Sequence, residues 1–175
     1  MQKPVTWLAA AATLLVALGG CSQEEQGSPQ PVEPTNNATS APTNQPGDAL
    51  ASMDACTVLE ELLAGQGFGP LESKTARNEC GATKIRYGGV GLALAPTQNL
   101  AEFAATTPGA TSFQINGRDA MEGEGQAGSC LVAMAVGEKA RVMTSMNAVG
   151  SSGIDECAEA RKYAKQLEPM LPKVQ

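Results

Sequence analysis

The chain has 175 residues, a formal net charge of −6 and no histidine. The lack of histidine excludes a Ser-His-Asp triad, a histidine general base and a zinc site built on histidine. Basic residues are scattered along the chain without forming a stripe, which argues against nucleic acid as a partner and against electrostatic docking to anionic lipid.

The first twenty residues have the pattern of a secretory signal peptide. A basic start is followed by an apolar stretch over 5–18, too short to span a bilayer, which needs about 20 apolar residues. Two glycines then precede Cys21, and this order resembles a lipobox, in which the peptidase cuts before a cysteine that carries diacylglycerol. We predict a lipoprotein signal peptide at 1–20 and a lipid-anchored chain on the extracytoplasmic side of the cell membrane. A plain secreted protein is the alternative.

The segment after Cys21 has the composition of a disordered tether. Residues 22–47 are dominated by Pro, Asn, Gln, Ser and Thr and hold almost no large apolar side chain. They would span about 30 Å as a flexible coil and up to about 80 Å as polyproline II. We therefore predict a lipidated tether over 21–47 and one domain over 48–175, which is long enough for a single modest core.

Four cysteines remain in the domain once Cys21 carries lipid: Cys56, Cys80, Cys130 and Cys157. An even set in an exported chain predicts two disulfides. Metal binding is the rival interpretation, but the chain has neither a CxxC motif nor histidine. Three pairings are possible, and spacing does not choose among them. Pairing neighbours would close loops of roughly 25 residues, each contributing about 3.5 kcal/mol in the chain-entropy model.

The first half of the domain predicts a helix and a hairpin. Apolar residues recur at helical spacing over 49–64, with Cys56 facing inward. Gly88-Gly89 is a two-residue turn signal. A turn there places three residue pairs on one apolar face: Tyr87 with Val90, Ile85 with Leu92, and Thr83 with Leu94.

The second half predicts a mixed series of elements. They are a short helix at 100–105, a hairpin turn at Asn116-Gly117, a glycine-rich loop at 123–129, strands at 130–136 and 140–147 joined by a three-residue loop, and a helix over 154–167 capped near Ser152 or Asp155. The order predicts an α+β fold, an antiparallel sheet of about five to six strands packed with N- and C-terminal helices.

Several short segments resemble an actinobacterial four-cysteine lipoprotein family that contains a domain of unknown function and includes some mycobacterial lipoproteins. They are Asp-Ala-Cys-Thr-Val-Leu at 54–59, Cys80 before the first hairpin, Gly-Arg-Asp-Ala at 117–120, and Asp-Glu-Cys at 155–157. The resemblance covers the whole chain; it departs at Gly81-Ala82, where an aromatic residue is expected. It implies Cys56–Cys80 and Cys130–Cys157 pairing and a fold similar to the PsbP-like group, and it brings no catalytic residues.

The candidates for site chemistry are few. Glu122 and Glu124 would share one face of an extended segment and so suit a cation, although a solvated loop or strand edge is the simpler interpretation. Met134, Met143 and Met146 would suit a soft metal, but the predicted register turns Met134 and Met146 into the core and Met143 away from it. We predict no catalytic residue, no metal site and no cofactor.

These patterns favour a non-enzymatic, monomeric envelope lipoprotein that binds a partner or ligand. Its contacts would be the membrane, through the diacylglyceryl cysteine, and an envelope protein or lipid. One alternative is a histidine-free enzyme that uses carboxylates or a Ser-Lys pair, and another is a passive structural surface protein.

Overall fold

The computed structural model describes residues 46–74, 76–150 and 152–173. The predicted signal peptide, Cys21 and almost all of the predicted tether lie outside these residues. None of the helices in the described part of the chain combines the length and the apolar character that a membrane span requires.

The described residues form an α+β fold, as predicted, but its sheet has seven strands rather than five to six. The strand that the sequence did not predict, β1, is short, polar and exposed, so it carries no apolar pattern. In chain order the elements are α1 (Pro46–Ala51), α2 (Ala55–Leu63), β1 (Glu72–Lys74), β2 (Glu79–Lys84), β3 (Gly88–Ala95), α3 (Leu100–Thr106), β4 (Thr111–Ile115), β5 (Arg118–Glu124), the 3-10 turn η1 (Gln126–Gly128), β6 (Cys130–Ala135), β7 (Arg141–Ala148), α4 (Glu156–Leu167) and the 3-10 turn η2 (Glu168–Met170).

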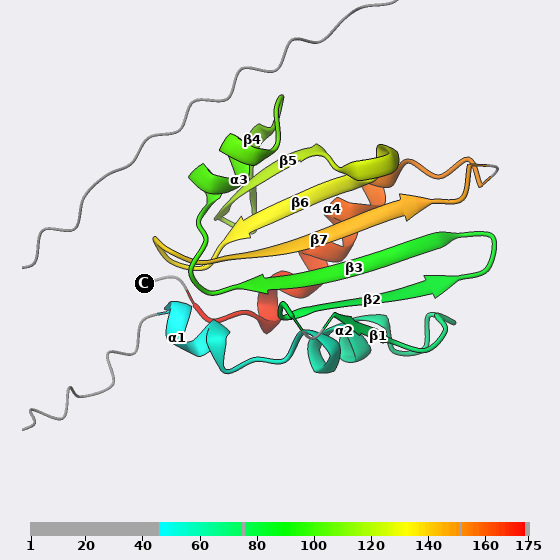
Figure 1. Ribbon diagram of the computed structural model, residues 1–175, viewed down its shortest axis with the longest axis horizontal. Helices are drawn as coiled ribbons and strands as arrows, with labels where there is room; N and C mark the ends of the chain where they lie inside the picture. Colours follow the sequence, from blue (N-terminus) through cyan, green and yellow to red (C-terminus); the bar gives the residue numbers. More distant parts are fainter. Residues whose placement is uncertain (1–45, 75, 151, 174–175) are drawn as a thin grey trace, which may run out of the picture. The chain divides into compact units, whose positions relative to one another are not determined.

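The sheet is antiparallel throughout, with the strand order β1-β2-β3-β7-β6-β5-β4. Two groups of sequential strands, β1–β3 and β4–β7, join where β3 pairs with β7 along its whole length. Figure 1 shows these two central strands running side by side. The sheet therefore has two free edges, at β1 and at β4.

The main core lies between one face of the sheet and helices α2 and α4. Helix α2 packs on β2 and β3, while α4 packs on β6 and β7 and lies behind them in Figure 1. Each disulfide joins one of these helices to the strand beneath it, Cys56 to Cys80 and Cys130 to Cys157. The pairing is the one that the family resemblance implied.

Only part of the opposite face is covered by a described helix. Helix α3 packs on β5 and β6, where Phe103 and Ala133 are buried apart from the main core. Arg141 fixes the start of α3 by donating to the Asn99 carbonyl across 2.8 Å. Met143 lies on this face and is partly exposed, whereas Met134 and Met146 are buried in the main core, as predicted.

Several local predictions are confirmed. Asn116-Gly117 is a hairpin turn that sets Ile115 opposite Arg118. The loop between β6 and β7 has the predicted register, and Asp155 caps α4 by accepting from the Ala158 amide. The predicted glycine-rich loop begins later than expected, because Gly123 and Glu124 still belong to β5.

The predicted helix over 49–64 is wrong in one respect, because it is broken into α1 and α2. Asp54 caps α2 by accepting from the Thr57 amide at 2.8 Å. The amide side chain of Asn78 spans the break, donating to the Met53 carbonyl and accepting from the Ala55 amide. These polar contacts satisfy backbone groups at the break that a continuous helix would bond internally.

The predicted turn at Gly88-Gly89 is also wrong. Both glycines belong to β3, and the turn lies just before them, closed by a hydrogen bond from the Tyr87 amide to the Lys84 carbonyl. Ala82 therefore faces Val90, and the side chains of Ile85 and Thr83 are exposed rather than buried. The glycine at 88 serves close packing, since a Cβ there would lie 2.1 Å from the Asn147 carbonyl oxygen.

This register predicts unequal effects of alanine at the two glycines. Gly88→Ala should lower the free energy of unfolding by more than about 2 kcal/mol, because φ is +140° and Asn147 blocks the Cβ. Gly89→Ala should lower it by less than about 1 kcal/mol, because its Cβ would meet only ordinary contacts. Chemical denaturation measures both values, and similar losses would contradict the register.

Candidate functional site

The two ends of the sheet differ in what they carry. At one end Pro46 lies beside Gly137 in the β6–β7 turn, so the chain that precedes the domain joins it there. The buried guanidinium of Arg118 holds the C-terminal segment at the same end by donating to the Pro172 carbonyl at 3.0 Å. The opposite end, about 23 Å away along the eight residues of β3, carries the β2–β3 turn.

This far end forms a small apolar projection, which we call the distal tip and define as Ile85, Arg86, Tyr87 and Val149. The Val149 amide donates to the Tyr87 carbonyl at 3.1 Å, which joins the loop after β7 to the turn. Ile85 is 90% exposed and Val149 is 43% exposed, and they are the exposed large aliphatic side chains of the described residues. Soluble domains often expose single apolar residues, but here two lie in segments that the Val149–Tyr87 hydrogen bond links at one end of the sheet.

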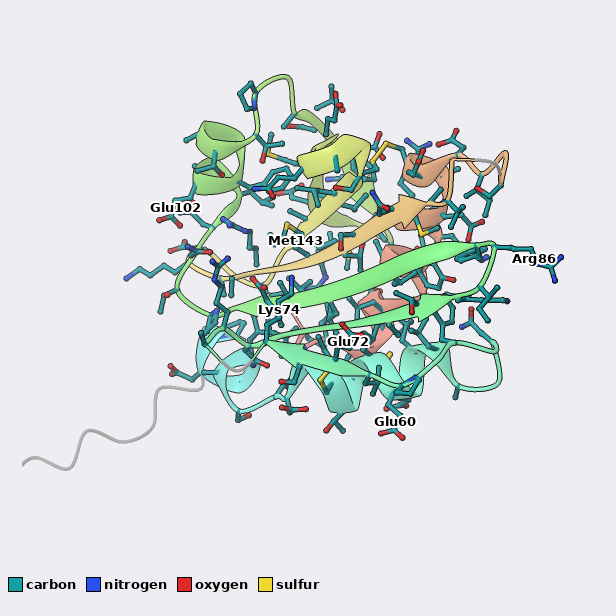
Figure 2. The ribbon with its side chains drawn as sticks, turned by 45° about the vertical axis from the view of Figure 1, so that its right-hand side comes forward. Glu60, Glu72, Lys74, Arg86, Glu102 and Met143 are labelled. Carbon is teal, nitrogen blue, oxygen red and sulfur yellow. A yellow bond between two sulfur atoms is a disulfide. The ribbon has the colours of Figure 1, made fainter. Side chains whose placement is uncertain are left out.

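The backbone of the tip is strained at Arg86. Its φ of 61° lies in the left-handed region, which suits glycine and is uncommon for long side chains. Gly88 and Gly89 follow after Tyr87, yet neither occupies this position of the turn. Figure 2 shows the Arg86 side chain pointing away from the body of the domain. Strain of this kind persists where surrounding contacts hold it, and it accumulates at functional sites.

A hydrogen-bonded network beneath the tip supplies such contacts. The Tyr87 hydroxyl donates its one proton to Glu159 on α4, so the Tyr163 hydroxyl is the donor in the 2.9 Å contact between the two tyrosines. Lys162 donates to the same Glu159 carboxylate at 2.8 Å. The network therefore fixes the end of the β2–β3 turn to the first half of α4.

Aromatic contacts add a second layer to this support. The ring of Phe68 meets Tyr87 and Tyr163 edge to face, with centroid distances of 5.7 and 6.3 Å. The ammonium group of Lys84 lies 5.4 Å from the Tyr87 ring centre and donates to the Gln66 carbonyl at 2.8 Å. The segment after α2 is thereby held against the turn.

The ionisation of the network is fixed rather than poised for proton transfer. Burial, together with the hydrogen bonds to Glu159 and Tyr163, raises the pKa of Tyr87 well above its ordinary value. Partial burial opposes ionisation of Glu159, but the bonds from Lys162 and Tyr87 outweigh it and lower the pKa of that carboxyl. The bond to Glu159 raises the pKa of Lys162. Each shift moves the group away from neutral pH, the opposite of what a general acid or base needs.

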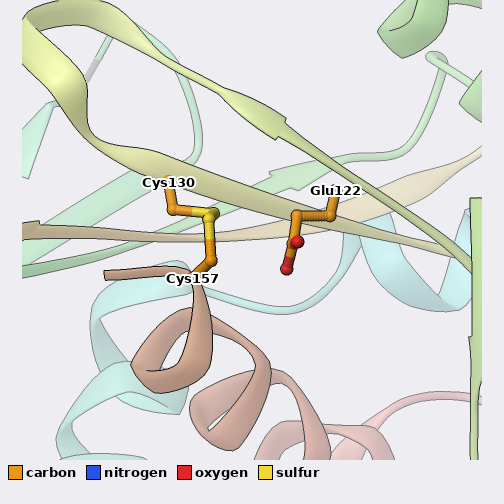
Figure 3. A group of neighbouring side chains, drawn as sticks. All are labelled: Glu122, Cys130 and Cys157. Atoms are coloured by element: carbon orange, nitrogen blue, oxygen red, sulfur yellow. A yellow bond between two sulfur atoms is a disulfide. The ribbon is translucent and has the colours of Figure 1, made fainter. Parts of the chain in front are cut away.

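The predicted pair Glu122 and Glu124 does not form a joint site. Both lie in β5, an interior strand, and Glu122 is bound to Arg161 of α4 at 2.9 Å. Figure 3 shows Glu122 beside the Cys130–Cys157 disulfide. One carboxylate oxygen and the two sulfurs all lie within 4.8 Å of one another. Because the two sulfurs are bonded to each other, this group holds no free thiolate for a metal.

A hollow of about 310 Å³ lies near the start of α2 and the strand edge at β1 and β2. Its polar side chains are already engaged with the protein, since Asn78 bonds the break before α2, Asp54 caps the helix and Arg77 pairs with Glu79. The remaining lining residues are Met53, Ala55, Cys56 and Ser73. The hollow therefore presents no unused charged group to a ligand.

Comparisons of the chain with protein families, with curated proteins and with solved structures each found no match. The resemblance to the four-cysteine lipoprotein family, and the likeness to the PsbP-like group, stay predictions.

Sequence reasoning missed the distal tip and its network. The misplaced turn put Ile85 and Tyr87 on the core face, so neither was expected at an exposed end. The signal that was present lies in α4, where Glu159, Lys162 and Tyr163 share one side of the helix. Their partner, Tyr87, is 72 positions from Glu159 in the chain, and spacing does not reveal such a contact.

The network predicts a pH-dependent loss of stability in Glu159→Gln. Because the folded pKa of Glu159 is lowered, its ionised form stabilises the fold above the unfolded pKa, near 4.3, and that contribution disappears as the pH falls through the folded pKa. At pH 7 the free energy of unfolding of the variant should be about 1 kcal/mol lower than that of the native chain, and this difference should shrink below about pH 4.

Denaturant titrations at a series of pH values measure this difference. Glu60→Gln, at an exposed position on α2, is the matched control and should change the free energy of unfolding by under about 0.5 kcal/mol at every pH. A Glu159→Gln difference that stays constant down to pH 3 would contradict the network.

Proposed function

We propose that this protein is a cell-envelope lipoprotein of non-enzymatic type, anchored through lipid on Cys21, whose domain docks a protein partner with its distal tip. The observation that carries the docking is the exposure of Ile85, at 90%, on a strained turn that a partly buried network holds in place. Ile85 is exposed to water until a partner covers it, so its burial in a complex is favourable. Because the backbone of the turn is already fixed, ordering that backbone costs little entropy on binding.

The position of the tip supports a partner other than the membrane that would anchor the chain. The chain from Cys21 joins the domain at Pro46, and the tip lies at the other end of β3. A tether over 21–47 would span about 30 Å as a coil, enough to let the domain stand off the bilayer with its tip outward. The pKa directions at Tyr87, Glu159 and Lys162 favour a docking role over a histidine-free enzyme at this place.

The anchor predicts that Cys21→Ala abolishes incorporation of lipid label and releases or stalls the precursor, because the thiol of Cys21 is the group that takes the lipid. Metabolic labelling with a fatty-acid probe, followed by fractionation of membranes, measures both effects. Cys21→Ser is a sterically matched control that should behave in the same way. Unchanged labelling and membrane retention in either variant would refute the anchor.

The docking predicts that a photoreactive amino acid at position 149 captures a neighbour when the tethered protein is irradiated in its own cells. Val149 is exposed, its amide bonds the Tyr87 carbonyl, and its side chain takes no part in the hydrogen bonds of the network, so a probe there leaves the network intact. The same probe at position 60, on the exposed side of α2, is the control. We expect one envelope protein to be captured repeatedly from position 149 and not from 60. Capture of nothing, or of the same set from both, would contradict docking by the tip.

A further inference from the structure

The distal tip carries a charge that has no use within the described part of the domain. Lys84 donates to the Gln66 carbonyl and Lys162 pairs with Glu159, so these two cations are engaged. Arg86 forms no hydrogen bond or ion pair with a described residue and points outward in Figure 2. It is adjacent in sequence to Ile85, the most exposed large aliphatic side chain described.

We infer that the partner presents an apolar socket for Ile85 with a carboxylate at its rim that receives Arg86. This inference rests on the proposed docking function and adds the chemistry of recognition. A guanidinium is suited to the rim because its planar fork bonds both oxygens of a carboxylate and it is more weakly hydrated than an ammonium. The aliphatic anchor supplies affinity, and the ion pair supplies orientation.

Charge also separates this occupant from a symmetric, tip-to-tip contact with a second copy of the same chain. Two tips that meet would bring Arg86 against Arg86 of the other copy, and like charges at close range oppose association. The chain carries a net charge of −6, so its average field opposes an acidic partner, and the exposed guanidinium of Arg86 offsets this repulsion at the tip.

The chemistry can be tested with a zero-length crosslinker. Carbodiimide joins an amine to a carboxylate only when the two are in contact, and it does not couple a guanidinium. Arg86→Lys places an amine at the tip with the positive charge kept, while Arg77→Lys, at the exposed Arg77 near the other end of β2, is the matched control. Both variants are made in the full lipidated chain, and membranes from the producing cells are treated with carbodiimide.

The expected result is an amide between position 86 and an Asp or Glu of the protein that the probe at position 149 captures, identified by mass spectrometry of the joined peptides. Arg77→Lys should give no such amide. Adding Ile85→Ser to Arg86→Lys should lower the yield about tenfold, because the apolar anchor is lost. The thermal unfolding temperatures of Arg86→Lys and Arg77→Lys should match that of the native chain, since neither arginine side chain packs against the core.

The possible failures are distinguishable. If position 149 captures one protein but position 86 gives no amide with it, docking by the tip stands and the carboxylate at the rim is overturned. An amide with a carboxylate of a second copy of this chain would make that copy the occupant and would overturn the proposed envelope partner. If position 149 yields only lipid adducts, or nothing, the proposed docking function itself falls and the inference falls with it.

Discussion

The hydroxyl group of Tyr87 connects the β2–β3 turn to helix α4, and the shape of the distal tip depends on this connection. It donates to Glu159 and accepts from Tyr163, so the residue that follows Arg86 is fixed from below. Without that support, Arg86 would leave the left-handed region, because that backbone conformation is unfavourable for a residue with a long side chain. A partly buried polar network thus specifies one conformation for an exposed apolar element.

The disulfides and the helix caps explain why the rest of the domain can support such an element. Each disulfide fastens a helix to the strand that it covers, and both closed loops are local in sequence. Arg118 and Asn78 satisfy backbone groups at the end where the chain joins the domain. These contacts therefore fix the backbone at that end and through the core. The network of Tyr87, Glu159 and Tyr163 fixes the backbone at the far end.

The sequence predicted features that depend on neighbours in the chain. Asn116-Gly117 gave a correct turn because both residues suit left-handed backbone, and Asp155 gave a correct cap because its carboxylate reaches the Ala158 amide. The β6–β7 register followed from apolar alternation on both strands. Cysteine count predicted two disulfides, but their pairing needed the family resemblance.

The features that were missed depend on contacts between distant segments. Gly88-Gly89 has the sequence of a two-residue turn. Gly88 is nevertheless a strand residue, and its lack of a side chain lets the β7 backbone approach at Asn147. Asn78 breaks the first helix from 25 positions away, and β1 forms by pairing with β2 although its residues are polar. The distal tip was not predicted because the turn was misplaced. The predicted register put Ile85 in the core, whereas the structure exposes it to solvent.

The most direct measurement of this account is amide hydrogen exchange at Val149 in the native chain. Its N–H donates to the Tyr87 carbonyl, so it reports whether the tip is held in one conformation. A fixed tip predicts exchange slowed at least about a hundredfold relative to an unfolded chain, and predicts that Tyr87→Phe removes most of this protection while the Val90 amide in β3 stays protected. Exchange of Val149 at the unfolded rate in the native chain would show that the tip is not held, and would contradict the account.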